Sequence, residues 1–201
     1  MRKKSHLSLA KFLVKNMQVQ GLVDHRKAFY IGSILPDLKP SFLTKRHTFD
    51  ETFGILINEI KKITVEFDIE KGINSYFARH LGVVTHYLSD YCTYPHNNVF
   101  HGSISEHVLY EKELKHSLKE YFSRVGTNRE RKQCHLITSL DEIVHSIVLI
   151  HKEYLKEIKC VNEDINYIIE LCYKVVNTIV SFLEKAISQI HCGDNLHVVC
   201  E

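Results

Sequence analysis

The chain has 201 residues, a length that suits one domain with a sizeable core and is short for two. Its formal net charge is +2, so overall charge gives no reason to expect binding to nucleic acid or to an acidic surface. Three prolines and eight glycines argue against a turn-rich β architecture, whereas 14 histidines, the commonest metal ligand, indicate metal chemistry.

The sequence shows no secretory signal and no membrane span. The basic residues at positions 2–4 are followed by apolar residues, but His6 and Lys11 interrupt these, so there is no long apolar run. No small-residue cleavage site follows. No stretch approaches 18 consecutive apolar residues. The six cysteines have no C-x-x-C spacing, which disfavours a thiolate zinc site. We therefore expect a cytoplasmic protein with reduced cysteines.

Apolar residues recur with the period of an α-helix along almost the whole chain. The predicted helices cover residues 7–17, 24–31, 44–63, 73–92, 103–126, 139–159 and 162–190. Pro36 and Pro40 predict a loop over 32–40. No segment shows the alternating pattern of a strand. The sequence predicts an all-α, single-domain bundle of six to seven helices over residues 1–193, with a loose tail at 194–201.

Local signals mark the ends of several helices. Ser103 with Glu106, and Ser139 with Glu142, have the spacing of a capping box, in which each residue satisfies a backbone N–H of the other. Pro95 should end the helix before it, since proline has no backbone N–H to donate. The residue that follows this proline should therefore lie in a loop between two helices.

The most informative histidines and carboxylates lie in one stretch in the middle of the chain. His86 and Asp90 are four residues apart on one predicted helix, where they border the apolar stripe, and His107 and Glu111 are four apart on the next. Residues with this spacing share a helix face, and a third histidine, His96, lies between the pairs. One pair alone is usually a surface hydrogen bond. Two pairs on consecutive helices predict a multi-metal hydrolase site, because imidazole and carboxylate bind zinc.

This stretch resembles the bacterial zinc-dependent phospholipase C family and the related zinc-dependent single-strand nucleases. In that family a His-x-x-x-Asp pair precedes a proline and a histidine, and a His-x-x-x-Glu pair follows. Upstream, the family has an early histidine, an aspartate in a short loop and a further histidine, which are matched here by His6, Asp37 and His47. The likeness runs from about residue 5 to residue 115, with the motifs in the same order, and implies an all-α fold.

The resemblance implies a site of three zinc ions that hydrolyses a phosphoester. Metal-bound hydroxide would attack phosphorus, and Asp37 would orient or deprotonate the attacking water. The implied ligands are Asp37, His47, His86 and Asp90 for the first metal, His96, His107 and Glu111 for the second, and His6 with a bridging Asp90 for the third.

The N-terminal ligand of the family differs in this chain. In the family, an N-terminal tryptophan chelates the third metal through its amine and carbonyl, but this chain contains no tryptophan. The third metal would then be held by His6 and Asp90 with water, held through the Met1 end, or be absent. The expected cofactor is accordingly Zn²⁺, two or three ions per chain.

Three functions fit these residues. The first is a zinc-dependent phosphoester hydrolase of the phospholipase C type, acting on a phospholipid headgroup or a soluble phosphodiester. The second is a nuclease, phosphodiesterase or phosphatase with the same site; nucleic acid is the less favoured substrate because the chain lacks a basic excess and tryptophans on which bases could stack. The third is a non-catalytic, metal-stabilised bundle, which eight ligand positions disfavour because a structural zinc needs four.

Overall fold

The computed structural model describes residues 1–38, 47–125, 139–157 and 159–194. Within these ranges the chain forms eight α-helices and no strand, so the predicted all-α, single-domain bundle is confirmed. The helices are α1 (Lys3–Met17), α2 (Gln20–Asp24), α3 (Arg26–Ile34), α4 (Phe49–Lys61), α5 (Ser75–Tyr91), α6 (Ile104–Val125), α7 (Leu140–Tyr154) and α8 (Val161–Asp194). Short 3-10 turns are η1 (Pro36–Leu38), η3 (Ile69–Lys71) and η4 (Tyr94–His96).

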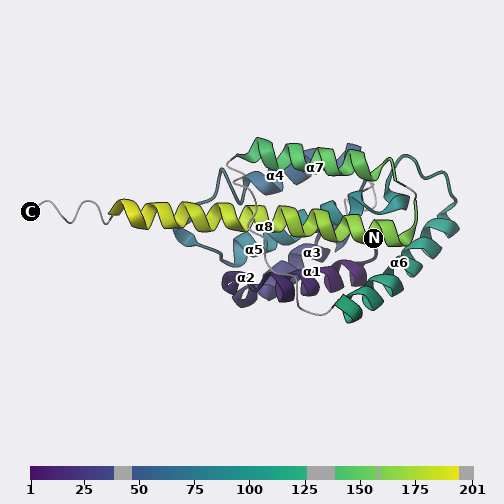
Figure 1. Ribbon diagram of the computed structural model, residues 1–201, viewed down its shortest axis with the longest axis horizontal. Helices are drawn as coiled ribbons and strands as arrows, with labels where there is room; N and C mark the ends of the chain where they lie inside the picture. Colours follow the sequence, from purple (N-terminus) through teal and green to yellow (C-terminus); the bar gives the residue numbers. More distant parts are fainter. Residues whose placement is uncertain (39–46, 126–138, 158, 195–201) are drawn as a thin grey trace, which may run out of the picture.

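The bundle is arranged around α5 and α8. In Figure 1 the long helix α8 runs along the long axis, with α4 and α7 on one side, α1 to α3 on the other, and α6 at one end. Helix α5 packs against α1, α3, α4 and α8. The N-terminus lies near α6 and the start of α8 (Figure 1).

Helix α5 is enclosed on every side over its second half. It begins after Asn74, whose side chain accepts a hydrogen bond from the backbone N–H of Phe77 at 3.0 Å. All residues from 81 to 91 are buried, which is typical of a core helix. The sequence predicted that His86 and Asp90 would only border the core. Both are completely buried, because neighbouring helices cover both faces of α5.

Two glycines let α3 and α5 touch backbone to backbone. A Cβ atom on Gly32 would lie 2.0 Å from the carbonyl oxygen of Arg79, and one on Gly82 would lie 2.3 Å from that of Phe29. Neither position can hold a side chain without moving a helix backbone, so the two glycines fix the separation of these helices.

The structure corrects two predicted boundaries. The second predicted helix is two helices, α2 and α3, and α3 continues to Ile34, so the predicted loop over 32–40 begins later. The backbone stays helical through Leu35, directly before Pro36, with φ −59° and ψ −41°, and Pro36 is accepted at the first position of η1. Residues 39–46 lie outside the described part of the chain.

The third predicted helix begins later than residue 44. Helix α4 starts at Phe49 because Thr48 caps it, its hydroxyl accepting from the backbone N–H of Glu51 at 3.4 Å. His47 therefore lies just outside the helix. The last helix begins earlier than predicted, at Val161. Asn162 is therefore inside this helix and does not cap it. The predicted tail lies outside the described residues from 195 onward.

Both capping boxes find support in the structure. The Ser103 hydroxyl accepts from the backbone N–H of Glu106 at 3.2 Å, and the backbone N–H of Ser103 donates to the Glu106 carboxylate at 2.6 Å. Ser139 accepts from the backbone N–H of Glu142 at 3.3 Å.

Among the described helices, none has the length and apolar character needed to cross a membrane.

Candidate metal centre

The first donor group joins residues from three parts of the chain. His86 and Asp90 lie on α5, and His47 lies directly before Thr48, the N-cap of α4. The Nδ1 atom of His47 lies 2.9 Å from His86 Nε2, and both nitrogens lie 3.2 Å from Asp90 Oδ2. Asp37 Oδ1, from the turn η1, is 3.7 Å from the same two nitrogens. All four residues are buried, so the donors converge in the interior.

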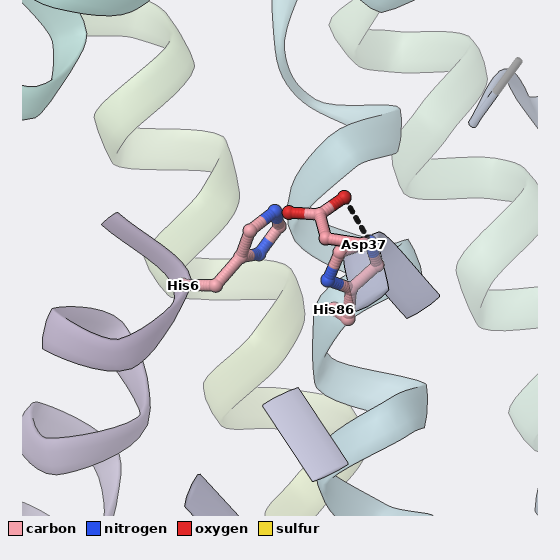
Figure 2. Close-up of side chains that lie close together, drawn as sticks. All are labelled: His6, Asp37 and His86. Carbon is pink, nitrogen blue, oxygen red and sulfur yellow. Dashed lines mark ion pairs between the residues drawn. The ribbon is translucent and has the colours of Figure 1, made fainter. Parts of the chain in front are cut away.

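His6 brings the first helix to this group. Its ring stacks on that of His86, with centroids 3.9 Å apart. Figure 2 shows His6 on α1 and His86 on α5, with the carboxylate of Asp37 beside the two rings and paired with His86. One donor atom from each of these three residues lies within 4.8 Å of the other two. The structure therefore places Asp37 with His6 as well as with His47.

The second donor group forms where η4 meets α6. Glu111 Oε1 is 3.2 Å from His96 Nε2 and 3.4 Å from His107 Nε2. His107 is the most exposed of the three side chains, at 35%, against 15% for Glu111 and 13% for His96. This group is more open to solvent than the first.

Asp90 connects the two groups. Its Oδ2 atom faces His47 and His86, whereas its Oδ1 atom lies 3.3 Å from His6 Nε2 and 3.7 Å from His96 Nδ1. The two oxygens of one carboxylate thus face different sets of imidazoles, which is the arrangement expected of a carboxylate that bridges two cations.

The nitrogen of Met1 lies between the same two groups. It donates to Asp90 Oδ1 at 2.6 Å, approaches His96 Nε2 at 2.7 Å, and is 3.2 Å from Glu111 Oε1. Burial acts to lower the pKa of this amine, but the carboxylates of Asp90 and Glu111 outweigh it and raise the pKa.

The structure brings together all eight residues that the sequence predicted as ligands. A family model described as zinc-dependent phospholipase C matches residues 5–161. The chain belongs to the zinc-dependent phospholipase C family. Searches of the curated proteins and of the solved structures found no match.

Membership of the zinc-dependent phospholipase C family supports a phospholipase C-like hydrolase that uses zinc and acts on a phosphoester. The match extends beyond the motifs and includes α7, so it covers most of the helices that enclose the donors. The ligand residues and the number of zinc ions stay predictions.

Three of the donors, His6, Asp90 and Glu111, are held in ionisation states that suit metal binding. Burial, and the charge of a neighbouring His86, lower the pKa of His6 to about 3, so its ring is neutral at physiological pH. Burial alone would raise the pKa of Asp90, but the Met1 amine and the surrounding histidines hold it well below its usual range. Hydrogen bonds from His107 and His96 likewise overcome burial and lower the pKa of Glu111. Neutral imidazole and ionised carboxylate are the forms that bind a cation.

The unpaired ring nitrogen of His6 is separate evidence that the donor set fits zinc. His6 Nε2 is buried and, among the described residues, has no partner in hydrogen-bonding geometry, although Asp90 Oδ1 lies within ion-pair distance. A buried polar atom left unpaired costs free energy, and a metal ion bound between these two groups would remove that cost. Imidazole nitrogens mixed with carboxylate oxygens are donors that zinc accepts.

Residues that sequence reasoning missed fix the orientation of the histidines. His86 Nδ1 lies 2.9 Å from the carbonyl oxygen of Ser33, which the glycine contact between α3 and α5 brings into reach. His6 Nδ1 lies 3.1 Å from the hydroxyl of Ser89. Each contact leaves the Nε2 atom of the ring turned toward Asp90, the usual arrangement for a histidine that binds a metal. No sequence signal marks Ser33, because its backbone carbonyl makes the contact.

Proposed function

We propose that the protein is a zinc-dependent phosphoester hydrolase of the phospholipase C type, with two or three zinc ions held by His6, Asp37, His47, His86, Asp90, His96, His107 and Glu111. The observation that carries the proposal is the position of Asp90, which has a different set of imidazoles at each carboxylate oxygen. Such a bridge suits neighbouring cations that share one phosphate.

The two groups have different tasks in this proposal. The first group, with His47, His86 and Asp90, is buried and would fix one ion in place. The second group, with His107 at its exposed edge, would hold an ion that meets the substrate. Zinc bound at such sites neutralises charge on phosphate oxygens and lowers the pKa of water to about 7.

Asp37 is the residue proposed to handle the water proton. Its Oδ1 atom is 3.7 Å from His47 Nδ1 and His86 Nε2, too long for a direct hydrogen bond, so the carboxylate can accept one from water. Burial raises the pKa of Asp37 above its usual value, which makes it a better base than a fully exposed aspartate. Asp37 would thereby orient the attacking water and take its proton.

Hydrolysis assays on three substrates test this function. The protein, stripped of metal by a chelator and then given zinc, is assayed on a phosphomonoester, a soluble phosphodiester and a choline phospholipid. We expect turnover of a phosphoester that chelation abolishes and zinc restores. Preference for the phospholipid identifies the headgroup as substrate, whereas preference for the soluble diester favours the phosphodiesterase alternative. Zinc binding without turnover on any substrate would instead indicate the non-catalytic bundle.

A further inference from the structure

A buried carboxylate outside the donor groups connects the elements that carry the second group. Asp164, in the first turn of α8, is fully buried. Its Oδ2 atom accepts from the backbone N–H of Tyr94 at 2.8 Å and from the hydroxyl of Tyr110 at 2.9 Å. Its Oδ1 atom accepts from the hydroxyl of Tyr154 at 2.7 Å. One side chain thus binds three separate segments of the chain.

Two of these partners are near neighbours of proposed ligands. Tyr94 is the first residue of the turn η4, and His96 is the last. Tyr110 immediately precedes Glu111 on α6. The two tyrosine rings also pack edge to face, with centroids 5.7 Å apart. Oδ2 of Asp164 therefore ties together the two elements whose donors, His96 Nε2 and Glu111 Oε1, lie 3.2 Å apart.

The fold alone does not account for an acid at this place. Burial raises the pKa of Asp164 to about 6, which shows that its charged form loses hydration inside the bundle. Apolar residues of similar volume would fill the same space without this loss. The hydrogen bonds from Tyr94, Tyr110 and Tyr154 offset the cost, and they also fix geometry that apolar packing would leave adjustable.

We propose that Asp164 is a positioning residue, which sets the separation of His96 and Glu111 by holding η4 and α6 to the start of α8. The inference rests on the proposed function, since it assumes that these two residues bind a metal. Asp164 lies three residues beyond the segment that matches the family model. The residue acts through Tyr94 and Tyr110 and does not contact the donors itself.

Two variants of graded severity test the proposal. Tyr110→Phe removes one hydrogen bond to Oδ2 and keeps the ring. Asp164→Ala removes both carboxylate oxygens, so the bonds from Tyr94, Tyr110 and Tyr154 are all lost. Zinc affinity is measured by titrating each metal-free protein with zinc in competition with a chromophoric chelator. We expect one binding step to weaken by about tenfold in Tyr110→Phe and more in Asp164→Ala, with the other steps unchanged.

Glu59→Ala provides the matched control. Glu59 is also a buried acid, but its partners are Lys62 and His80, neither of which is a proposed ligand. The same acid-to-alanine change there should leave every zinc step as in the unaltered protein. Thermal unfolding of the metal-free proteins measures the loss of fold stability in each variant separately.

The outcomes separate the two claims. If the unaltered protein binds at least two zinc ions and both variants titrate as it does, the positioning role is wrong and the proposed function stands. If all three variants lose affinity at every step in proportion to their loss of thermal stability, the role of Asp164 is general stabilisation and the inference is likewise wrong. If the unaltered protein binds no zinc, the proposed function and the inference about Asp164 are both wrong.

Discussion

Asp90 is the residue that contacts both donor groups. It is completely buried and lies within 3.7 Å of nitrogens from His6, His47, His86 and His96, besides the amine of Met1. An ionised carboxylate in such a place requires compensating positive charge, since an unpaired buried charge is strongly destabilising. Asp37 lies at one edge of the first group and touches fewer donors. Substitution of the two aspartates should therefore have different effects.

Asp90→Asn and Asp37→Asn separate metal binding from proton transfer. Asp90→Asn replaces an oxygen that faces one set of imidazoles with an amide nitrogen, which cannot bind a cation, so zinc content should fall by at least one ion per chain. Asp37→Asn should retain most of the zinc and lose turnover by about 100-fold or more, because an amide cannot accept a proton. Elemental analysis and an assay on the preferred substrate measure the two effects. Full zinc content in Asp90→Asn, or substantial turnover in Asp37→Asn, would contradict these roles.

His151 gives a prediction about pH that is independent of the donors. Its ring is buried, stacks on Phe49 with centroids 4.2 Å apart, and places Nε2 3.0 Å from the side-chain oxygen of Asn97. Burial lowers the pKa of His151 to about 4. Between pH 6.5 and 4 the unfolded chain therefore binds more protons at this residue than the folded chain does. Its contribution to stability is complete above pH 6.5 and is lost as the pH falls through this window.

Chemical denaturation of the metal-free protein at pH 7 and pH 4 measures this contribution. The unaltered protein should lose about 2–3 kcal/mol more free energy of unfolding between these pH values than His151→Gln, whose side chain does not titrate. Equal losses in the two proteins would show that His151 is protonated in the folded state or that its ring is accessible to water.

At the scale of the helices, the contact between α3 and α5 decides the geometry of the first group. Gly32 and Gly82 let the two backbones meet, and this contact brings the carbonyl of Ser33 to His86 Nδ1 at 2.9 Å. The sequence predicted α5 and its ligands from their spacing, because residues four apart on a helix share a face whatever surrounds it. It could not predict this crossing, because a close approach depends on two glycines that lie on different helices.

Gly82→Ala tests the importance of this contact. The added Cβ would lie 2.3 Å from the carbonyl oxygen of Phe29 and 2.8 Å from the backbone nitrogen of Ser33, so a helix must move. We expect a loss of about 1–3 kcal/mol in the free energy of unfolding of the metal-free protein, and weaker zinc binding because Ser33 moves away from His86.

Gly54→Ala is the control for this change. Gly54 lies on α4, and apart from its own helix backbone and chain neighbours no atom of the described residues lies within 4 Å of the position of its added Cβ. Alanine is the better helix former, so this variant should be more stable by about 0.5–1 kcal/mol and should bind zinc as the unaltered protein does. Equal stability in the two variants would show that the contact between α3 and α5 is loose.

At the scale of the whole molecule, two halves of the chain contribute different things to the site. The first half and α6 carry all eight proposed ligands. Their spacing predicted the two pairs on α5 and α6 with His96, and the resemblance to a known family added His6, Asp37 and His47. The last two helices carry none of the proposed ligands. However, His151 of α7 forms a hydrogen bond with Asn97, and Asp164 of α8 accepts one from Tyr94. These two residues have no motif, so only their contacts in the folded chain associate them with the site.

The zinc content of the whole protein tests the central claim most directly. The protein is stripped with a chelator, given excess zinc, freed of unbound metal and measured for zinc per chain by elemental analysis. Two donor groups, with Asp90 in the first and within 3.7 Å of His96 in the second, predict two or three zinc ions per chain. One ion or none would contradict a site in which one carboxylate bridges neighbouring metals.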